Sequence, residues 1–301
     1  MSDIPKSKIQ NPKSTDLLIV ITGPTASGKS ALAIELAEAY GGEIICADSR
    51  TVYRGMDIGT AKPSLEDRRH VPHYLLDVVD PDERFTAADF QKQARQVITQ
   101  IRARGQIPFV VGGTGLYIDG LIFDYKFGPD ADNDRRRQWE NSTVTELQSL
   151  LKSQHIPLPF NKQNKRHLVR SLEQGGVNNN RGNTIGKNII VVAIATEKYE
   201  LETLIRERVE GMFAMGIIAE AQALAHRFGW SHEALTGNIY PIIRRYCDGE
   251  ITLSQAKELA IIKDRQLAKK QLTWLKRHNY IKWLTIDEAR NYLIPILGPQ
   301  N

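Results

Sequence analysis

The chain is poor in cysteine and has no long run of apolar residues. Cys46 and Cys247 are the two cysteines among 301 residues, too few for the disulfide framework of a small secreted protein. No segment approaches the ~20 apolar residues of a membrane-spanning helix, and residues 1–16 lack the apolar stretch of a secretory signal. These absences predict a cytoplasmic protein without a membrane segment, whose polar tail 1–16 is disordered.

The chain also lacks a strong excess of either positive or negative charge. The formal net charge is +5, which is compatible with a polyanionic partner but does not require one. The positive charge is concentrated in segment 254–278, where Glu258 and Asp264 are the acidic residues. The cations of this segment are Lys257, Lys263, Arg265, Lys269, Lys270, Lys276 and Arg277. They could bind RNA phosphates while Trp274 stacks on a base. The alternative is a helix face that is simply exposed to solvent.

The strongest motif is the run Gly-Pro-Thr-Ala-Ser-Gly-Lys-Ser at residues 23–30. It follows a continuous apolar strand at 17–21 and precedes a helix at 31–40, which is the setting that a P-loop requires. In a P-loop, backbone N–H groups at a helix N-terminus surround anionic oxygens. Lys29 would reach a terminal phosphate and Ser30 would ligate Mg²⁺. The sequence therefore predicts a phosphate-binding enzyme.

Two further strands, at 43–47 and 107–111, lead into polar or glycine-rich segments, and a strand at 189–194 follows later. Strands alternating with helices predict an α/β fold, a P-loop NTPase-like parallel sheet wound by helices. Ligands of such sheets bind at the carboxyl ends of the strands, so Asp48 and Thr114 should lie near the bound phosphates. Asp48 would act as a general base or hold Mg²⁺ through water. The alternatives are a helix cap at Asp48 and a simple strand-to-helix turn at 112–115.

The character of the chain changes near residue 125. Residues 130–174 are charged and helix-forming, and residues 175–187 are rich in Gly and Asn and predict a flexible loop. We expect a core of residues 17–125 and 188–301, with a small helical insertion domain at 126–187. The end of the core should be mostly helical, at about 200–215, 217–228 and 254–278.

A P-loop alone does not identify the reaction. A GTPase should carry an Asn-Lys-x-Asp motif at a strand end, whereas residues 161–164 read Asn-Lys-Gln-Asn within the insertion. A kinase of a small metabolite remains compatible with a P-loop and a nearby Asp48.

The order of motifs resembles the tRNA dimethylallyltransferases, also called tRNA isopentenyltransferases. Besides the P-loop and Asp48-Ser49, the chain has the highly specific run Gly-Met-Asp-Ile-Gly-Thr-Ala-Lys-Pro at 55–63. The resemblance spans about residues 17–284 and includes Val52-Tyr53, Pro72-His73, segment 87–90, segment 112–117, Arg166, segment 170–173, Arg208, Met212, Gly216, Glu220 and segment 266–274.

The resemblance implies transfer of a dimethylallyl group from dimethylallyl diphosphate to the N6 amine of the adenosine 3′ of a tRNA anticodon. The diphosphate leaving group would then occupy the P-loop residues Gly23, Pro24, Thr25, Ala26, Ser27, Gly28, Lys29 and Ser30, with Thr114 nearby. The resemblance assigns catalysis to Asp48, Arg208, Lys29 and Thr25, and implies Mg²⁺ at Ser30. The residues expected to bind tRNA are Asp48, Ser49, Tyr53, Lys62, Gly113, Arg166, Arg170, Lys269 and Lys270. We expect a monomer.

Several positions depart from the family's usual residues, and the insertion is shorter than usual. These departures put tRNA binding in question rather than the chemistry; they are Thr51, Leu204, Asn238, Asp264 and Lys270. Two rival interpretations besides the kinase are an enzyme that prenylates free adenine nucleotides and an inactive RNA-binding relative. The basic segment 254–278 and the insertion favour tRNA over a free nucleotide.

Overall fold

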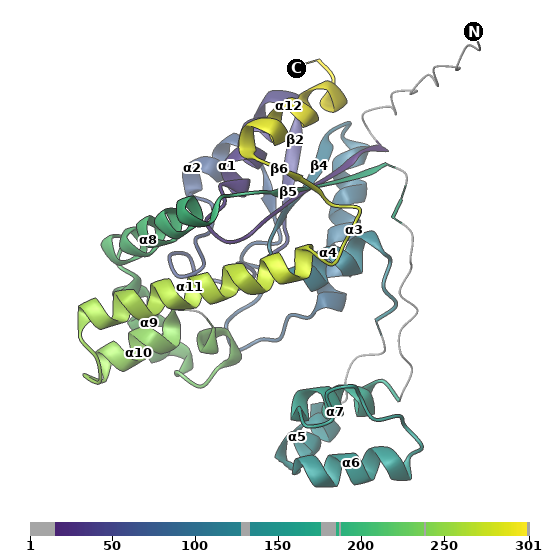
Figure 1. Ribbon diagram of the computed structural model, residues 1–301, viewed down its shortest axis with the longest axis vertical. Coiled ribbons are helices and arrows are strands. Elements are labelled where there is room, and N and C mark those ends of the chain that lie inside the picture. Colours follow the sequence, from purple (N-terminus) through teal and green to yellow (C-terminus); the bar gives the residue numbers. More distant parts are fainter. Residues whose placement is uncertain (1–15, 128–132, 176–184, 187, 238, 300–301) are drawn as a thin grey trace. The chain divides into compact units, whose positions relative to one another are not determined.

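The computed structural model describes residues 16–127, 133–175, 185–186, 188–237 and 239–299 (Figure 1). The chain divides into two compact units, one of residues 1–122 and 185–301 and one of residues 123–184. The tail at 1–15, most of the loop at 175–187, and Asn238 lie outside the described residues.

The larger unit is built on a parallel sheet of six strands in the order β3-β2-β4-β1-β5-β6. The strands are β1 (Leu18–Thr22), β2 (Gly42–Cys46), β3 (His73–Tyr74), β4 (Ile107–Gly112), β5 (Ile189–Ile194) and β6 (Lys282–Leu284). Every residue of β1 is buried, as expected for a strand that has a parallel neighbour on each side. The predicted α/β fold with a parallel sheet is confirmed.

Helices cover the sheet because side chains alternate between its two faces. The helices α1 (Lys29–Tyr40) and α12 (Ile286–Leu297) contact each other and share a core with alternate residues of β1, among them Ile19 and Ile21. The helices α3 (Ala87–Ala103) and α4 (Gly115–Ile122) also pack together. Helix α1 begins at Lys29, so the P-loop opens directly onto its N-terminus.

A second core lies among the helices that follow β5. It joins α8 (Lys198–Ala214), α9 (Ile217–Phe228), η2 (Glu233–Thr236), α10 (Tyr240–Cys247) and α11 (Leu253–Leu275). Val52, Tyr53 and Met56, from the loop after β2, belong to the same core. This loop, which carries Asp48 at its start, is therefore fixed by the C-terminal helices.

The smaller unit has a core of its own. It contains α5 (Asn133–Asn141), α6 (Val144–Ser153) and α7 (Lys165–Glu173), which bury Leu147, Leu151 and Leu168 completely. Apolar residues at helical spacing supply this core.

The shortest elements were not anticipated. Strands β3 and β6 and helix α2 (Leu65–His70) were missed, because two to six residues carry too little periodicity to be recognised. Helix α11 ends at Leu275 rather than near residue 278. None of the helices in the described part of the chain is long and apolar enough to cross a bilayer.

Candidate active site

The P-loop adopts a conformation that turns its backbone around a central space. Gly28, the residue before α1, has a φ of +76°, and a Cβ atom there would lie 2.7 Å from Ile286 Cδ1. The left-handed backbone favours glycine, and any larger residue would also have to displace the Ile286 methyl group. The loop thus presents N–H groups at the positive end of α1, the arrangement that binds phosphate.

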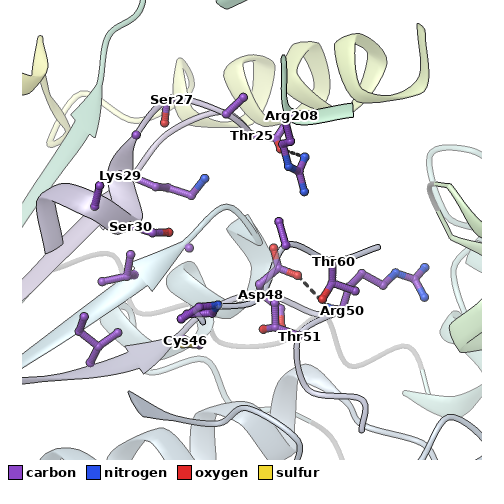
Figure 2. Close-up of a pocket in the computed structure, with 18 of the residues that line it drawn as sticks. Thr25, Ser27, Lys29, Ser30, Cys46, Asp48, Arg50, Thr51, Thr60 and Arg208 are labelled. Carbon is purple, nitrogen blue, oxygen red and sulfur yellow. Dashed lines mark hydrogen bonds between the residues drawn. The ribbon is translucent and has the colours of Figure 1, made fainter. Parts of the chain in front are cut away.

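A cavity of about 250 Å³ opens at the P-loop and extends across the ends of β2 and β4 (Figure 2). It brings the P-loop residues 25–30 together with Asp48 and Arg208, as predicted, although they come from three separate segments. The Ser27 hydroxyl, also on this cavity, is buried and has no hydrogen-bond partner among the described residues. A ligand oxygen would satisfy this group, so the cavity fits a polar ligand.

Lys29 points into the cavity (Figure 2). Its Nζ donates a hydrogen bond to the Pro24 carbonyl oxygen at 3.1 Å. Burial lowers the pKa of the Lys29 ammonium to about 8; Asp48 opposes this shift and Arg208 adds to it. An anionic ligand would favour the charged form again.

Asp48 lies two residues after the end of β2 and faces the same cavity. Its Oδ1 accepts a hydrogen bond from the Arg50 backbone N–H at 2.8 Å. The helix-cap alternative is wrong, because residues 49–64 form turns and loop and the next helix after Asp48 begins only at Leu65. One carboxylate oxygen is used in this turn, which leaves the other for a substrate.

Arg208 reaches the P-loop from α8. Its Nη1 donates a short hydrogen bond to Thr25 Oγ1 and a second one of 2.6 Å to Asp264 Oδ2 on α11. Figure 2 shows its guanidinium pointing into the cavity. Burial raises the pKa of the Asp264 carboxyl, although Arg208 opposes the shift.

Gln271 on α11 also holds the P-loop, a role that we did not expect from the sequence. Its Oε1 accepts a hydrogen bond from the Thr25 N–H at 2.8 Å, and its Nε2 donates to the Gly113 carbonyl at 3.4 Å. A Cβ atom on Gly113 would lie 2.2 Å from this Nε2. Gln271 lies within the run 266–274 that carries part of the resemblance, and its spacing gives no sign of this contact.

Thr114 joins the ends of β2 and β4 instead of lining the cavity. Its Oγ1 accepts a hydrogen bond from the Ser49 N–H at 3.0 Å, and its own N–H donates to the Ala47 carbonyl at 3.2 Å. Residues 113–114 are also the turn between β4 and α4. The donor-binding role predicted for Thr114 stays a prediction, and its observed contacts position Ser49 beside Asp48.

The specific run at 55–63 is organised by one carboxylate. Glu220 on α9 accepts hydrogen bonds from three successive backbone N–H groups, those of Asp57, Ile58 and Gly59, at 2.6 to 2.9 Å. It also accepts one from the Tyr240 hydroxyl at 2.8 Å. The loop therefore takes its shape from α9 and α10 and brings Thr60 to the cavity.

We expect Glu220→Ala to lower the free energy of unfolding by roughly 2–4 kcal/mol, because it leaves several polar groups without their charged partner. Thermal unfolding measures this change. Glu210→Ala is the control, since Glu210 is half exposed in an ion pair with Lys257 and should contribute under about 1 kcal/mol. Equal stability of the two variants would contradict the role given to Glu220.

Two residues predicted to contact tRNA are buried. Tyr53 belongs to the helical core. The Lys62 side chain is 1% exposed and forms ion pairs with Asp57 at 2.8 Å and Asp77 at 2.5 Å, while it donates a further bond to the Tyr53 carbonyl. The structure thus gives Lys62 a role in shaping the loop, and its contact with tRNA stays a prediction.

Asp48, Ser49 and Gly113, which are also predicted to contact tRNA, follow the ends of β2 and β4. The four remaining predicted contacts, all cations, fall in two places. Lys269 and Lys270 are exposed on α11, whereas Arg166 and Arg170 lie on α7 of the insertion, where Arg170 pairs with Glu173 at 3.3 Å. Trp274 was suggested as a surface for base stacking. Its ring instead packs against Gly115, where a Cβ atom on Gly115 would lie 2.2 Å from Trp274 Cδ2.

The donor set is compatible with Mg²⁺. The Ser30 hydroxyl and the Asp48 carboxylate line one cavity, and oxygen atoms are the ligands that Mg²⁺ prefers. The described residues contain no group of three His, Cys, Asp or Glu that could hold a metal. Mg²⁺ commonly binds through one or two protein oxygens, substrate phosphates and water, which this site could provide.

Comparison with known proteins identifies close relatives. A tRNA dimethylallyltransferase of Pelotomaculum thermopropionicum is 38% identical over 285 residues, which cover 90% of this chain and 91% of the relative. One from Citrifermentans bemidjiense, tRNA dimethylallyltransferase 1, is 40% identical over 279 residues, covering 89% and 91%.

Solved structures agree with these relatives. The tRNA isopentenylpyrophosphate transferase of Bacillus halodurans superposes with a TM-score of 0.71 and 34% identity, covering 94% of this chain and 97% of its own. A eukaryotic dimethylallyltransferase acting on tRNA has a TM-score of 0.75 at 21% identity, covering 92% and 75%, and shares the fold.

The family model for IPP transferase matches residues 51–278. This match begins after the P-loop and Asp48, but the sequence relatives extend over about 90% of the chain. The chain belongs to the IPP transferase family.

Proposed function

We propose that the protein transfers the dimethylallyl group of dimethylallyl diphosphate to the N6 amine of the adenosine 3′ of the anticodon in tRNA. The observation that carries this proposal is a P-loop with two cations, Lys29 and Arg208, on the same cavity as a carboxylate, Asp48. The names of the sequence relatives support the same activity.

The reaction breaks the bond between C1 of the prenyl group and the diphosphate oxygen, and forms a bond between C1 and N6. Negative charge grows on the departing diphosphate, and Lys29, Arg208 and the P-loop N–H groups would stabilise it. The amine loses one proton, which the carboxylate of Asp48 accepts. Mg²⁺, when bound at Ser30, would supply further charge stabilisation for the leaving group.

The cavity also offers apolar surface for a prenyl chain. Ile44, Cys46 and Val111 line it beside the phosphate cradle, together with Pro63. Burial raises the pKa of the Cys46 thiol to about 12, so Cys46 is a neutral, apolar neighbour there. This apolar part of the lining suits a small branched hydrocarbon.

The acceptor is proposed to be tRNA because of the positive surface on α11. Lys263, Lys269 and Lys270 are exposed along this helix, and exposed cations of this kind bind RNA phosphates. The adenine must leave the anticodon stack to reach the cavity, at a cost of a few kcal/mol. We propose that the insertion also contacts tRNA, and that the enzyme acts as a cytoplasmic monomer.

Mass spectrometry of bulk tRNA after incubation with enzyme, Mg²⁺ and dimethylallyl diphosphate tests the proposal. We expect one anticodon-loop adenosine to gain the mass of the prenyl group. Prenylation of free adenine nucleotides but not tRNA would identify the nucleotide enzyme instead. Phosphate transfer from labelled ATP to a small alcohol would identify a kinase. Binding of tRNA without any transfer would indicate an inactive relative.

Lys269→Ala should weaken tRNA binding and lower the slope of log affinity against log salt by about 1, because one phosphate contact is lost. Filter binding over a series of salt concentrations measures both. Lys282→Ala is the control. Lys282 lies on strand β6 rather than on α11, and its ammonium is 3.7 Å from the centre of the Tyr292 ring. A lower rate at saturating tRNA in the Lys269 variant would argue against a role limited to binding.

A further inference from the structure

The acidic residue Asp264 is placed where it can fix the conformation of Arg208. It lies on α11 with a side chain that is 9% exposed, and its Oδ2 is 2.6 Å from Arg208 Nη1, whose side chain is 18% exposed. The same nitrogen donates to Thr25 Oγ1 in the P-loop. Asp264 and Thr25 therefore hold one edge of the guanidinium from two different segments.

The orientation of the guanidinium follows from these contacts. Because both bonds use Nη1, Nη2 remains available to a ligand in the cavity that Arg208 lines. An arginine side chain has several freely rotating bonds, and ordering it costs conformational entropy. A partner that orders Arg208 before the ligand arrives removes that cost from binding.

A purely structural role, joining α8 to α11, is already filled by other ion pairs. Arg206 pairs with Glu258 at 2.8 Å, Lys257 with Glu210 at 2.5 Å, and Arg265 with Glu202 at 2.6 Å. The members of these three pairs are all at least 30% exposed, so solvent weakens them. The Asp264–Arg208 pair is the more buried one, and it is the one at the cavity.

We propose that Asp264 is a positioning residue that holds the Arg208 guanidinium against Thr25, with its free edge directed at the donor's diphosphate. The proposal rests on the function proposed above, which places the diphosphate in the P-loop. Asp264 touches neither substrate in this scheme and acts only through Arg208. In the sequence, Asp264 stands out only as a departure from the family's usual residue.

A double-mutant cycle tests the proposal. Asp264→Ala should lower kcat/KM for dimethylallyl diphosphate roughly 10- to 100-fold and leave the KM for tRNA unchanged. Asp264→Asn keeps an acceptor oxygen for Nη1 and should lose less. In an Arg208→Ala background, Asp264→Ala should cause little further loss, because the group that it positions is already gone. Glu258→Ala, on the same helix, should match the wild type.

Binding of inorganic diphosphate, measured by calorimetry, provides a second readout that does not need turnover. Asp264→Ala should weaken this binding about tenfold when Arg208 is present and hardly at all when it is absent.

Full additivity of the two substitutions, or tighter binding after Asp264→Ala, would overturn the positioning role. An active wild type with an unaffected Asp264→Ala variant would overturn the positioning role but not the proposed function. An inactive wild type that binds diphosphate with the expected dependence on Asp264 would overturn the proposed function alone. No diphosphate binding at all would overturn both.

Discussion

Replacing Asp48 with alanine should reduce prenyl transfer at least about 10³-fold, equivalent to roughly 4 kcal/mol of transition-state stabilisation. An exocyclic adenine amine is a weak nucleophile and must lose a proton as its bond to carbon forms. Asp48 is the carboxylate that shares the cavity with the P-loop. Rates measured at saturating donor and tRNA report this loss, since substrate binding should survive the substitution.

Two further variants separate chemistry from folding at this position. Asp48→Asn retains an oxygen for the Arg50 N–H, which Asp48 Oδ1 accepts at 2.8 Å, but it cannot take up a proton at neutral pH. It should therefore be nearly as inactive as Asp48→Ala while keeping the wild-type melting temperature. Asp82→Ala, on an exposed turn, should be fully active. An Asp48→Asn variant of nearly normal rate would show that the general base lies elsewhere.

The second large effect should come from Lys29. Lys29→Ala is expected to lower kcat/KM for the donor roughly 10²- to 10³-fold, because a charge aimed at the leaving group is lost. Lys29 is the P-loop residue whose ammonium stays inside the cavity, where it donates to the Pro24 carbonyl at 3.1 Å.

The same lysine predicts how donor binding depends on pH. Burial lowers its pKa in the free protein to about 8, and a bound diphosphate must raise it, since opposite charge favours the ammonium. Its contribution to binding is therefore complete below pH 8 and declines as the pH rises from 8 towards the higher pKa of the complex. A non-reactive thiolodiphosphate analogue, itself almost fully ionised above about pH 7, should bind more weakly at pH 9.5 than at pH 7.

Lys29→Arg and Lys29→Ala are the controls for this titration. Arginine stays charged throughout the range, so the decline should disappear in Lys29→Arg. It should also disappear in Lys29→Ala, with weak binding at every pH. A decline that persists in both variants would assign the titration to another group.

Local patterns predicted the parts of this site that are local in the chain. The apolar run at 17–21, the motif at 23–30 and the start of α1 are contiguous, so strand, P-loop and helix follow from one another. Asp48 and segment 112–115 come at the ends of neighbouring strands, and parallel topology brings such ends together. The resemblance added Arg208, which no spacing would have suggested.

Contacts between distant segments could not be predicted in this way. Gln271 binds Thr25 across 246 positions of sequence, and Asp264 binds Arg208 across 56. Neither side chain forms a pattern with its sequence neighbours. The resemblance implies that Lys62 contacts tRNA, but its partners Asp57 and Asp77 surround it only in the folded loop. The first two contacts depend on how α8 and α11 meet the P-loop, and the third depends on the fold of the loop after β2.

The central claim is that the P-loop before α1 holds the diphosphate of a prenyl donor while Asp48 takes the proton of the amine that attacks the donor. A crystal structure with dimethylallyl thiolodiphosphate and Mg²⁺ tests it most directly. We predict the diphosphate among the N–H groups of residues 26–30, in contact with Lys29 and Arg208, and the prenyl C1 turned towards Asp48. An analogue bound elsewhere, or a P-loop that accepts ATP in its place, would contradict the account.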